Sequence, residues 1–131
     1  MKEVFKKGDQ KTYSFKVKAQ DVAHFEQDAV HDVCATFTLA REIEWATRLF
    51  VLDMLEEGEE GIGTHLNIEH LSPALIGEEV EVEAEFYDIK NREIICNYVV
   101  KVGERIVAKG TTGQKILQKN KLAQLFDGLS K

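Results

Sequence analysis

Two histidines lie five residues apart in the segment GTHLNIEHLSP, residues 63–73, beside the only proline of the chain. Histidine is the side chain best suited to take up or release a proton near neutral pH. Either His65 or His70 could therefore act as a general acid or base, provided that the fold turns its ring toward a partner and a substrate.

The two-residue period of a strand separates these histidines. The more apolar face holds Ile62, Thr64, Leu66, Ile68 and His70, so we expect His70 to point inward and His65 into solvent. An inward histidine is either a hydrogen-bonded core residue or a base whose pKa is set by burial and a nearby carboxylate. The pattern alone favours the core residue.

Glu44 is the carboxylate that could complete such a site. It lies in a predicted helix over residues 36–57, on a flank that is otherwise mostly apolar, which is unusual for an acid. An ordinary ion pair with Arg48, one turn later, would also explain it.

Thr36 and Thr38 supply hydroxyl groups where this helix should begin, and helix capping alone would account for them. Thr36 and Glu44 are eight residues apart, about 12 Å along a straight helix. They could meet around one substrate without touching each other.

The remaining pattern predicts the elements that must position these residues. Beside the helix we expect strands over 11–18, 62–72, 78–89, 93–102 and 104–117, a short helix over 119–129, and a loop or short helical turns over 19–34. Residues 90–92 and 103–104 are predicted hairpin turns. The order predicts an α+β fold, with one long helix wrapped by a curved antiparallel sheet of about five strands.

The helix itself carries an apolar stripe of Leu39, Ile43, Ala46, Phe50 and Met54, and the spacing of three and four residues marks a face packed on the core. Trp45, Leu49 and Leu52 cover a second face. We therefore expect this helix to be buried on more than one side.

Composition narrows the class of protein. The 131 residues suit a single domain over 1–131, with a net charge of −6 and scattered basic residues that argue against nucleic acid as a partner. The apolar runs are too short for a membrane span, and the first residues do not form a secretory signal. The chain is expected to be soluble and cytoplasmic.

Cys34 and Cys96 are predicted to be buried free thiols, and no metal-ligand spacing is present.

Taken together, the run Thr36, Glu44-Trp45, Gly63-Thr64 and His70, followed by Pro73 and Gly77, resembles the hotdog-fold thioesterases related to fluoroacetyl-CoA thioesterase. The resemblance extends over roughly residues 10–118, and it depends on the joint spacing rather than on any single motif.

The resemblance implies a hotdog fold, a homodimer or dimer of dimers, and hydrolysis of a small or medium acyl-CoA thioester. It assigns Thr36, Glu44 and His70 as the catalytic residues. Four further positions are implied to contact the substrate: Gly63, whose N–H would hold the thioester carbonyl, with Thr64, Val30 and Gln114. CoA enters as part of the substrate, and no other cofactor is implied.

The sequence departs from the family pattern at two places. The last core strand reads GTTGQK over residues 110–115, so that Gln114 replaces the usual arginine. The lid phenylalanines of the fluoroacetyl-specific enzyme correspond to Gln27 and Val30, so selectivity for fluorine is not expected. We expect some of the basic side chains to contact the phosphates of CoA. The candidates are Lys90, Arg92, Lys101, Arg105, Lys109 and Lys115.

Three other classes fit parts of the pattern. A non-catalytic acyl-CoA-binding hotdog protein is compatible with the altered GTTGQK segment, because fold does not fix function. A hydratase or dehydratase would need an acid–histidine pair in another placement. A purely structural dimerisation module would leave Glu44 and His70 without a role.

Overall fold

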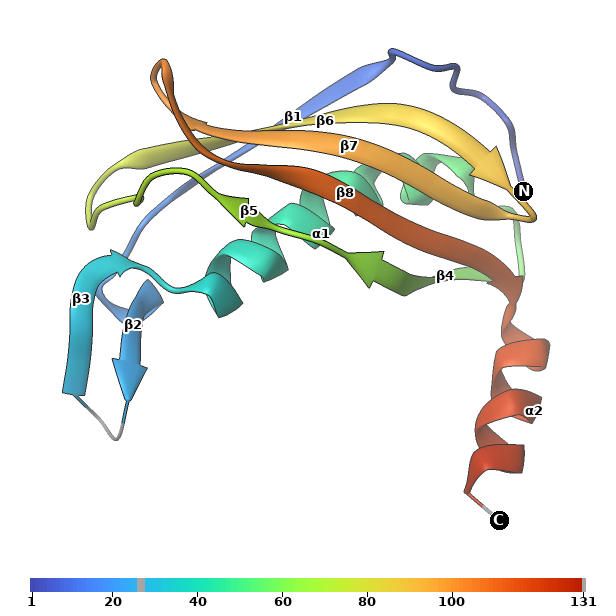
Figure 1. Cartoon of the computed structure of the whole chain (residues 1–131). Coiled ribbons are helices and arrows are strands. Elements are labelled where there is room, and N and C mark those ends of the chain that lie inside the picture. The colour runs from blue at the N-terminus through green and yellow to red at the C-terminus, as the bar shows by residue number, and fades with distance from the viewer. Residues whose placement is uncertain (26–27, 131) are drawn as a thin grey trace.

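The computed structural model describes residues 1–25 and 28–130, except for the side chains of residues 23–32. A curved antiparallel sheet arches over one long helix, α1 (Thr36–Met54), which is the hotdog architecture (Figure 1). The strand order is β1 (Gln10–Lys16), β6 (Glu79–Lys90), β7 (Glu93–Val102), β8 (Arg105–Gln118) and β4 (Glu59–Leu66). The short strand β5 (Glu69–His70) follows β4 and also pairs with β8. The predicted fold class is confirmed.

Alternating side chains on the sheet create the core. In β6 the buried residues are Val80, Val82, Ala84 and Phe86, while the glutamates between them are at least partly exposed. The five residues of the predicted stripe on α1 are all buried as well. Removing these aliphatic and aromatic side chains from water stabilises the fold by about 2 kcal/mol for each large residue.

The opposite face of α1 is open. Phe37 is 77% exposed, Trp45 43% and Leu52 41%, because the sheet covers the helix from one side only (Figure 1). The expectation that α1 is buried on more than one side is therefore wrong within a single chain.

A β-bulge in β4 changes the direction in which its side chains point. Gly61 pairs with Ile116 and Gly63 with Gln114, but the next pair is His65 with Gly113, so Thr64 has no partner in the ladder. An extra residue of this kind reverses the alternation beyond it. Before the bulge, Gly61 and Gly63 are the residues that face α1. The predicted inward direction of Ile62 and Thr64 is therefore wrong. Beyond the bulge, Leu66 points inward as predicted.

Residues 19–34, which we expected to form a loop or short helical turns, contain one such turn and a hairpin. The turn is a short 3-10 helix, η1 (Ala19–Asp21), which leads into the hairpin of β2 (Val22–Phe25) and β3 (Asp28–Cys34). The hairpin stands away from the main sheet (Figure 1). It is tied back where the Cys34 N–H donates to the Ala74 carbonyl oxygen at 2.8 Å. Its sequence shows no clean alternation, so the two strands were not predicted.

The boundaries of the other elements follow the sequence closely. The helix α1 ends at Met54, three residues before the predicted end, which keeps Glu56 and Glu57 out of a helix terminus where negative charge is unfavourable. Both predicted turns are present. Asn91 and Arg92 adopt positive φ, whereas at 103–104 only Gly103 does, as expected of a type II′ turn.

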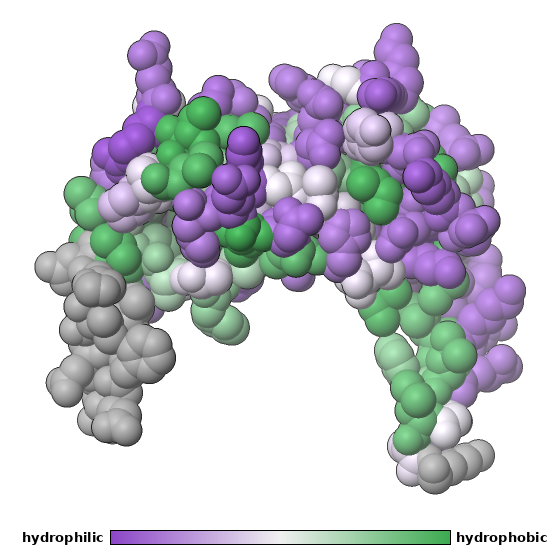
Figure 2. All heavy atoms as spheres, in the orientation of Figure 1, coloured by the Kyte–Doolittle hydropathy of each residue, from purple (hydrophilic) through white to green (hydrophobic). Residues whose placement is uncertain are grey.

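A second helix, α2 (Lys119–Leu129), continues from β8 and projects away from the sheet, as predicted in extent (Figure 1). Its Leu122 is buried, whereas Leu125, Phe126 and Leu129 are exposed. Apolar side chains gather on the side of α2 that faces the hollow under the sheet (Figure 2). In the part of the chain that is described, neither helix has the length and hydropathy needed to cross a membrane.

Candidate functional site

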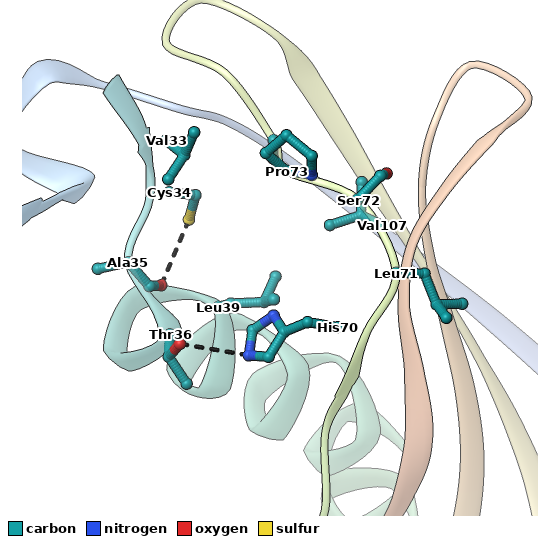
Figure 3. Close-up of a pocket in the computed structure, with 11 residues that line it drawn as sticks. Val33, Cys34, Ala35, Thr36, Leu39, His70, Leu71, Ser72, Pro73 and Val107 are labelled. Atoms are coloured by element: carbon teal, nitrogen blue, oxygen red, sulfur yellow. Dashed lines mark hydrogen bonds between the residues drawn. The ribbon is translucent and has the colours of Figure 1, made fainter. Parts of the chain in front are cut away.

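Thr36 and His70 meet at the start of α1, although 34 residues separate them in the sequence. The Thr36 Oγ1 atom lies 3.2 Å from the His70 Nε2 atom, within hydrogen-bond distance (Figure 3). Thr36 is the first residue of α1 and His70 the last residue of β5. The ring of His70 reaches α1 as the strand period predicts, while the residue remains exposed to solvent.

An apolar cavity of about 460 Å³ opens beside this pair. We call it the apolar cavity; its walls come from the end of β3, the start of α1, the segment after β5, and β8 (Figure 3). The lining residues are Val33, Cys34, Ala35, Thr36, Leu39, His70, Leu71, Ser72, Pro73, Ala74 and Val107. None of them is an acid, a lysine or an arginine.

The thiol of Cys34 belongs to the wall of this cavity and stays protonated. Burial, with the negative charges of Asp21 and Glu42, raises its pKa to about 11. The Sγ atom donates to the Ala35 carbonyl oxygen at 3.6 Å. Only the thiolate is a strong nucleophile, so Cys34 is a neutral wall residue rather than an attacking group.

Glu44 lines a second, more polar space further along α1. This polar cavity has a volume of about 360 Å³ and is lined by Glu44, Gly63, Thr64, His65, Leu66, Thr112, Gly113 and Gln114. A smaller hollow of about 220 Å³ adjoins Glu44 and is lined also by Arg41, Trp45 and Arg48. The sequence analysis considered Arg48 only as an ion-pair partner of Glu44 and did not consider Arg41, although the helical spacing places both on the same side of α1 as Glu44.

Two glycines of β4 shape the space between the strand and α1. A Cβ atom added to Gly61 would lie 2.6 Å from Cγ1 of Val51, so a side chain there would collide with the helix. A Cβ atom at Gly63 would have nothing within 4 Å. The absent side chain of Gly63 is thus part of the empty space beside Glu44.

The predicted alternative for Glu44, an ion pair with Arg48, does not occur among the salt bridges of the described residues. The Arg48 Nη1 atom instead donates to the Gly61 carbonyl oxygen at 3.3 Å. The Glu44 side chain is exposed and borders the polar cavity.

Gln114 lines the polar cavity and also ties β8 to α1. Its Nε2 atom donates to the Glu44 carbonyl oxygen at 3.3 Å and to Thr47 Oγ1 at 3.1 Å, and the residue is only 6% exposed. The Thr47 hydroxyl in turn donates to carbonyl oxygens of α1. A hydrogen-bonded buried amide of this kind fixes the turn of the helix that presents Glu44.

The outer face of β4 engages the side chains next to the bulge. Thr64 donates a short hydrogen bond to the carboxylate of Glu93, and His65 Nε2 lies 3.1 Å from Thr111 Oγ1. His65 therefore points away from α1, as predicted. Val30 lies in β3, but its side chain is among those outside the described residues, as is the whole of Gln27.

The proposed catalytic residues thus divide into two groups. Thr36 and His70 share the apolar cavity, whereas Glu44 lies with Gly63 and Gln114 around the polar cavity. No cavity of the described chain contains all three catalytic candidates. Within the described residues there is also no group of three or more His, Cys, Asp or Glu side chains that could hold a metal ion.

Half of the cations suggested for the CoA phosphates are already engaged. Arg92 pairs with Glu59, Lys101 with Glu83 and Arg105 with Glu78. In the described part of the chain, the ion pairs do not involve Lys90, Lys109 or Lys115. These three lysines are the better candidates for an anionic ligand.

Comparison with known proteins identifies the family. The model of the fluoroacetyl-CoA-specific thioesterase family, FlK, matches residues 17–120. The chain belongs to this family. The match includes every residue to which the sequence assigned a role in the site. A search of curated proteins finds no significant match.

Solved structures of family members and other hotdog proteins are similar over nearly the whole chain. A hypothetical protein of Thermus thermophilus, described as a thioesterase superfamily member, is 31% identical over 98% of this chain and 95% of its own, with a TM-score of 0.91. The fluoroacetyl-CoA thioesterase FlK is 21% identical over 96% and 98%, with a TM-score of 0.86. A hot-dog-like protein from Thermanaerovibrio acidaminovorans is 17% identical over 95% and 92%, with a TM-score of 0.87. These structures agree on the hotdog fold.

Proposed function

We propose that this protein of the thioesterase family hydrolyses a small or medium acyl-CoA thioester to the free acid and CoA. One observation carries the proposal: Thr36 and His70, distant in sequence, lie 3.2 Å apart at the edge of an apolar cavity. A hydroxyl and an imidazole are two of the groups that a hydrolytic site uses, and the cavity beside them gives space for the acyl group.

In this proposal the Thr36 hydroxyl positions the thioester carbonyl or the attacking water, and His70 transfers the proton. As a base it would take a proton from water, and as an acid it would give one to the leaving thiolate. Negative charge develops on the carbonyl oxygen during attack. The N–H of Gly63 would stabilise that charge, as in an oxyanion hole.

Glu44 would act on the same thioester from the polar cavity. Its carboxylate could activate a water or attack the carbonyl carbon directly, giving a transient anhydride. Both routes use the space left by Gly63, and Thr64 and Gln114 would border the bound substrate there. CoA supplies the leaving thiol as part of the substrate, and the proposal requires no metal or further cofactor.

We also propose that the working form is a homodimer. In the described chain β4 pairs with β8 on one side only, and such an edge can pair with its own copy about a two-fold axis. The open face of α1 exposes Phe37 and Trp45 nearby. A second copy covering both features would bring further groups to the divided site.

Free thiols at Cys34 and Cys96 support a reducing compartment, the cytoplasm.

The test of the proposed function is thiol release from a panel of acyl-CoAs by the wild type and by Glu44→Gln at equal concentration. We expect release by the wild type and a loss of kcat of at least about 100-fold in Glu44→Gln. Glu60→Gln, an exposed glutamate of β4 outside both cavities, is the matched control and should retain full activity. Wild-type turnover in Glu44→Gln would refute the assignment.

The division of Thr36 and His70 from Glu44 favours a second candidate, a non-catalytic acyl-CoA-binding protein. It predicts that the wild type binds CoA thioesters without releasing thiol from any of them. The same panel, combined with a direct binding measurement, separates the two candidates.

A further inference from the structure

We propose that the acyl group of the substrate is an uncharged aliphatic chain of medium length, about six to ten carbons, held in the apolar cavity. This inference rests on the proposed thioesterase function and specifies which thioesters the site would accept. It starts from the side chains that line the cavity and from the hydrogen bonds that their neighbours already make.

The described walls offer mainly apolar surface. Leu39, Pro73, Ala74 and Val107 contribute aliphatic groups, and the lining residues that the structure describes include no lysine, arginine or acid. A carboxylate at the far end of an acyl chain would lose its hydration here and gain no partner, which is strongly unfavourable. Acyl groups that carry a second carboxylate are therefore excluded.

Four hydrogen-bond donors of the wall are already engaged. The Ser72 hydroxyl donates to the Ile106 carbonyl oxygen at 2.8 Å, and the Cys34 N–H donates to Ala74. The N–H groups of Leu71 and Ser72 both donate to the Val107 carbonyl oxygen. These four donors are not available to a polar acyl substituent. The pair lies where the reacting carbonyl would sit.

Volume sets the length of the chain. One water molecule takes about 30 Å³ of liquid volume, and a chain carbon takes a similar share, so half to two-thirds of a 460 Å³ cavity holds roughly eight to ten heavy atoms. An acetyl group would leave most of this apolar surface in contact with water. Each added methylene that fills it should increase binding of the transition state about fourfold.

The experiment compares kcat/KM for acetyl-, butanoyl-, hexanoyl-, octanoyl-, dodecanoyl- and succinyl-CoA. We expect octanoyl-CoA to exceed acetyl-CoA by at least about 100-fold. The kcat/KM for butanoyl-CoA should exceed that for succinyl-CoA, which has the same number of acyl carbons but ends in a carboxylate in place of the methyl group, by a similar factor. An acetyl preference, a flat profile or equal use of succinyl-CoA would overturn the inference.

A charge introduced at the wall gives a second, independent test. Pro73 lines the edge of the cavity and is exposed (Figure 3), while Ile106 is 43% exposed and is not among the lining residues. Pro73→Arg should narrow the gap between the kcat/KM values for butanoyl- and succinyl-CoA by at least about tenfold, because the guanidinium would pair with the terminal carboxylate. Ile106→Arg is the matched control and should leave the gap unchanged. Equal behaviour of the two variants would contradict the placement of the acyl chain.

The results also separate this inference from the proposed function. Failure to release thiol from every thioester would overturn hydrolysis, and the acyl preference with it. Release of thiol without the expected preference would overturn the acyl assignment alone.

Discussion

The apolar cavity and the polar cavity border the same helix but differ in almost every property of their walls. The first is lined by aliphatic side chains and a protonated thiol, with Thr36 and His70 at its edge. The second contains a carboxylate, a buried amide and two glycines. Each lacks what the other offers, so neither cavity alone has the groups that hydrolysis of a thioester needs.

The difference suggests how one helix can serve two tasks. The start of α1 provides a hydroxyl and an apolar surface, and the middle of α1 provides a carboxylate next to a strand with no side chain at Gly63. An aliphatic chain and an attacking water need opposite surroundings. Keeping those surroundings on separate turns of the helix allows either one to change without the other.

His70→Ala tests the pair beside the apolar cavity, and it should lower activity more than the other substitutions below. Removing the imidazole deletes the proton-transfer group, so we expect kcat to fall by about 10²- to 10⁴-fold. Because His70 is exposed, Tm should stay close to that of the wild type. Glu69→Ala, at the neighbouring exposed position of β5 outside both cavities, serves as the control in the same kinetic assay. If both variants lost activity equally, the role assigned to His70 would fail.

Two glycine substitutions in β4 test the polar cavity and the packing of the strand next to it. Gly63→Val should fill the space beside Glu44 and lower kcat/KM by about tenfold or more, with little change in stability, since nothing lies within 4 Å of the new Cβ. Gly61→Ala should lower the stability of the fold and leave kcat/KM of the folded protein close to the wild-type value, because its Cβ would lie 2.6 Å from Cγ1 of Val51. We expect it to destabilise the fold by about 1–3 kcal/mol. Thermal unfolding and initial rates distinguish the two, and a stable, fully active Gly61→Ala would contradict the packing.

Gln114→Met should have the smallest effect of the three. It keeps the length of the side chain but removes the amide that donates to the Glu44 carbonyl oxygen and to Thr47. The expected cost is about 1–2 kcal/mol of unfolding free energy, together with a decrease in kcat that exceeds any change in KM. Gln118→Met, an exposed position at the end of β8, is the control. An increase in KM alone would indicate that Gln114 contacts the substrate rather than positioning the helix.

Much of the scaffold could be read from the sequence, because burial on one face imposes a period. The stripe on α1 and the alternation in β6 both correspond to buried surfaces, and their elements were predicted to within a few residues. The hairpin of β2 and β3 lies away from the main sheet and carries no such period. The early end of α1 was also missed, since the apolar pattern continues past the last turn of the helix.

The bulge at Thr64 explains the main error near the candidate site. A strict two-residue period placed Ile62 and Thr64 toward α1, but one unpaired residue in β4 reverses the pattern at that point. His70 lies beyond the bulge, so its direction was predicted correctly. The polar cavity itself could not be predicted, because it depends on a glycine of β4 that faces the helix. Arg41 could have been found, as Arg48 was, from its helical spacing to Glu44.

The protonated thiols have a practical consequence for studying the molecule. Burial raises the pKa of Cys34 to about 11 and that of Cys96 to about 12, so at neutral pH both should react slowly with maleimides and other alkylating reagents. A new cysteine at the exposed Leu125 of α2 would then be the preferred target. A fluorophore or spin label could be attached there without first removing the native cysteines, and distances between labels would report directly on how two copies of the chain assemble.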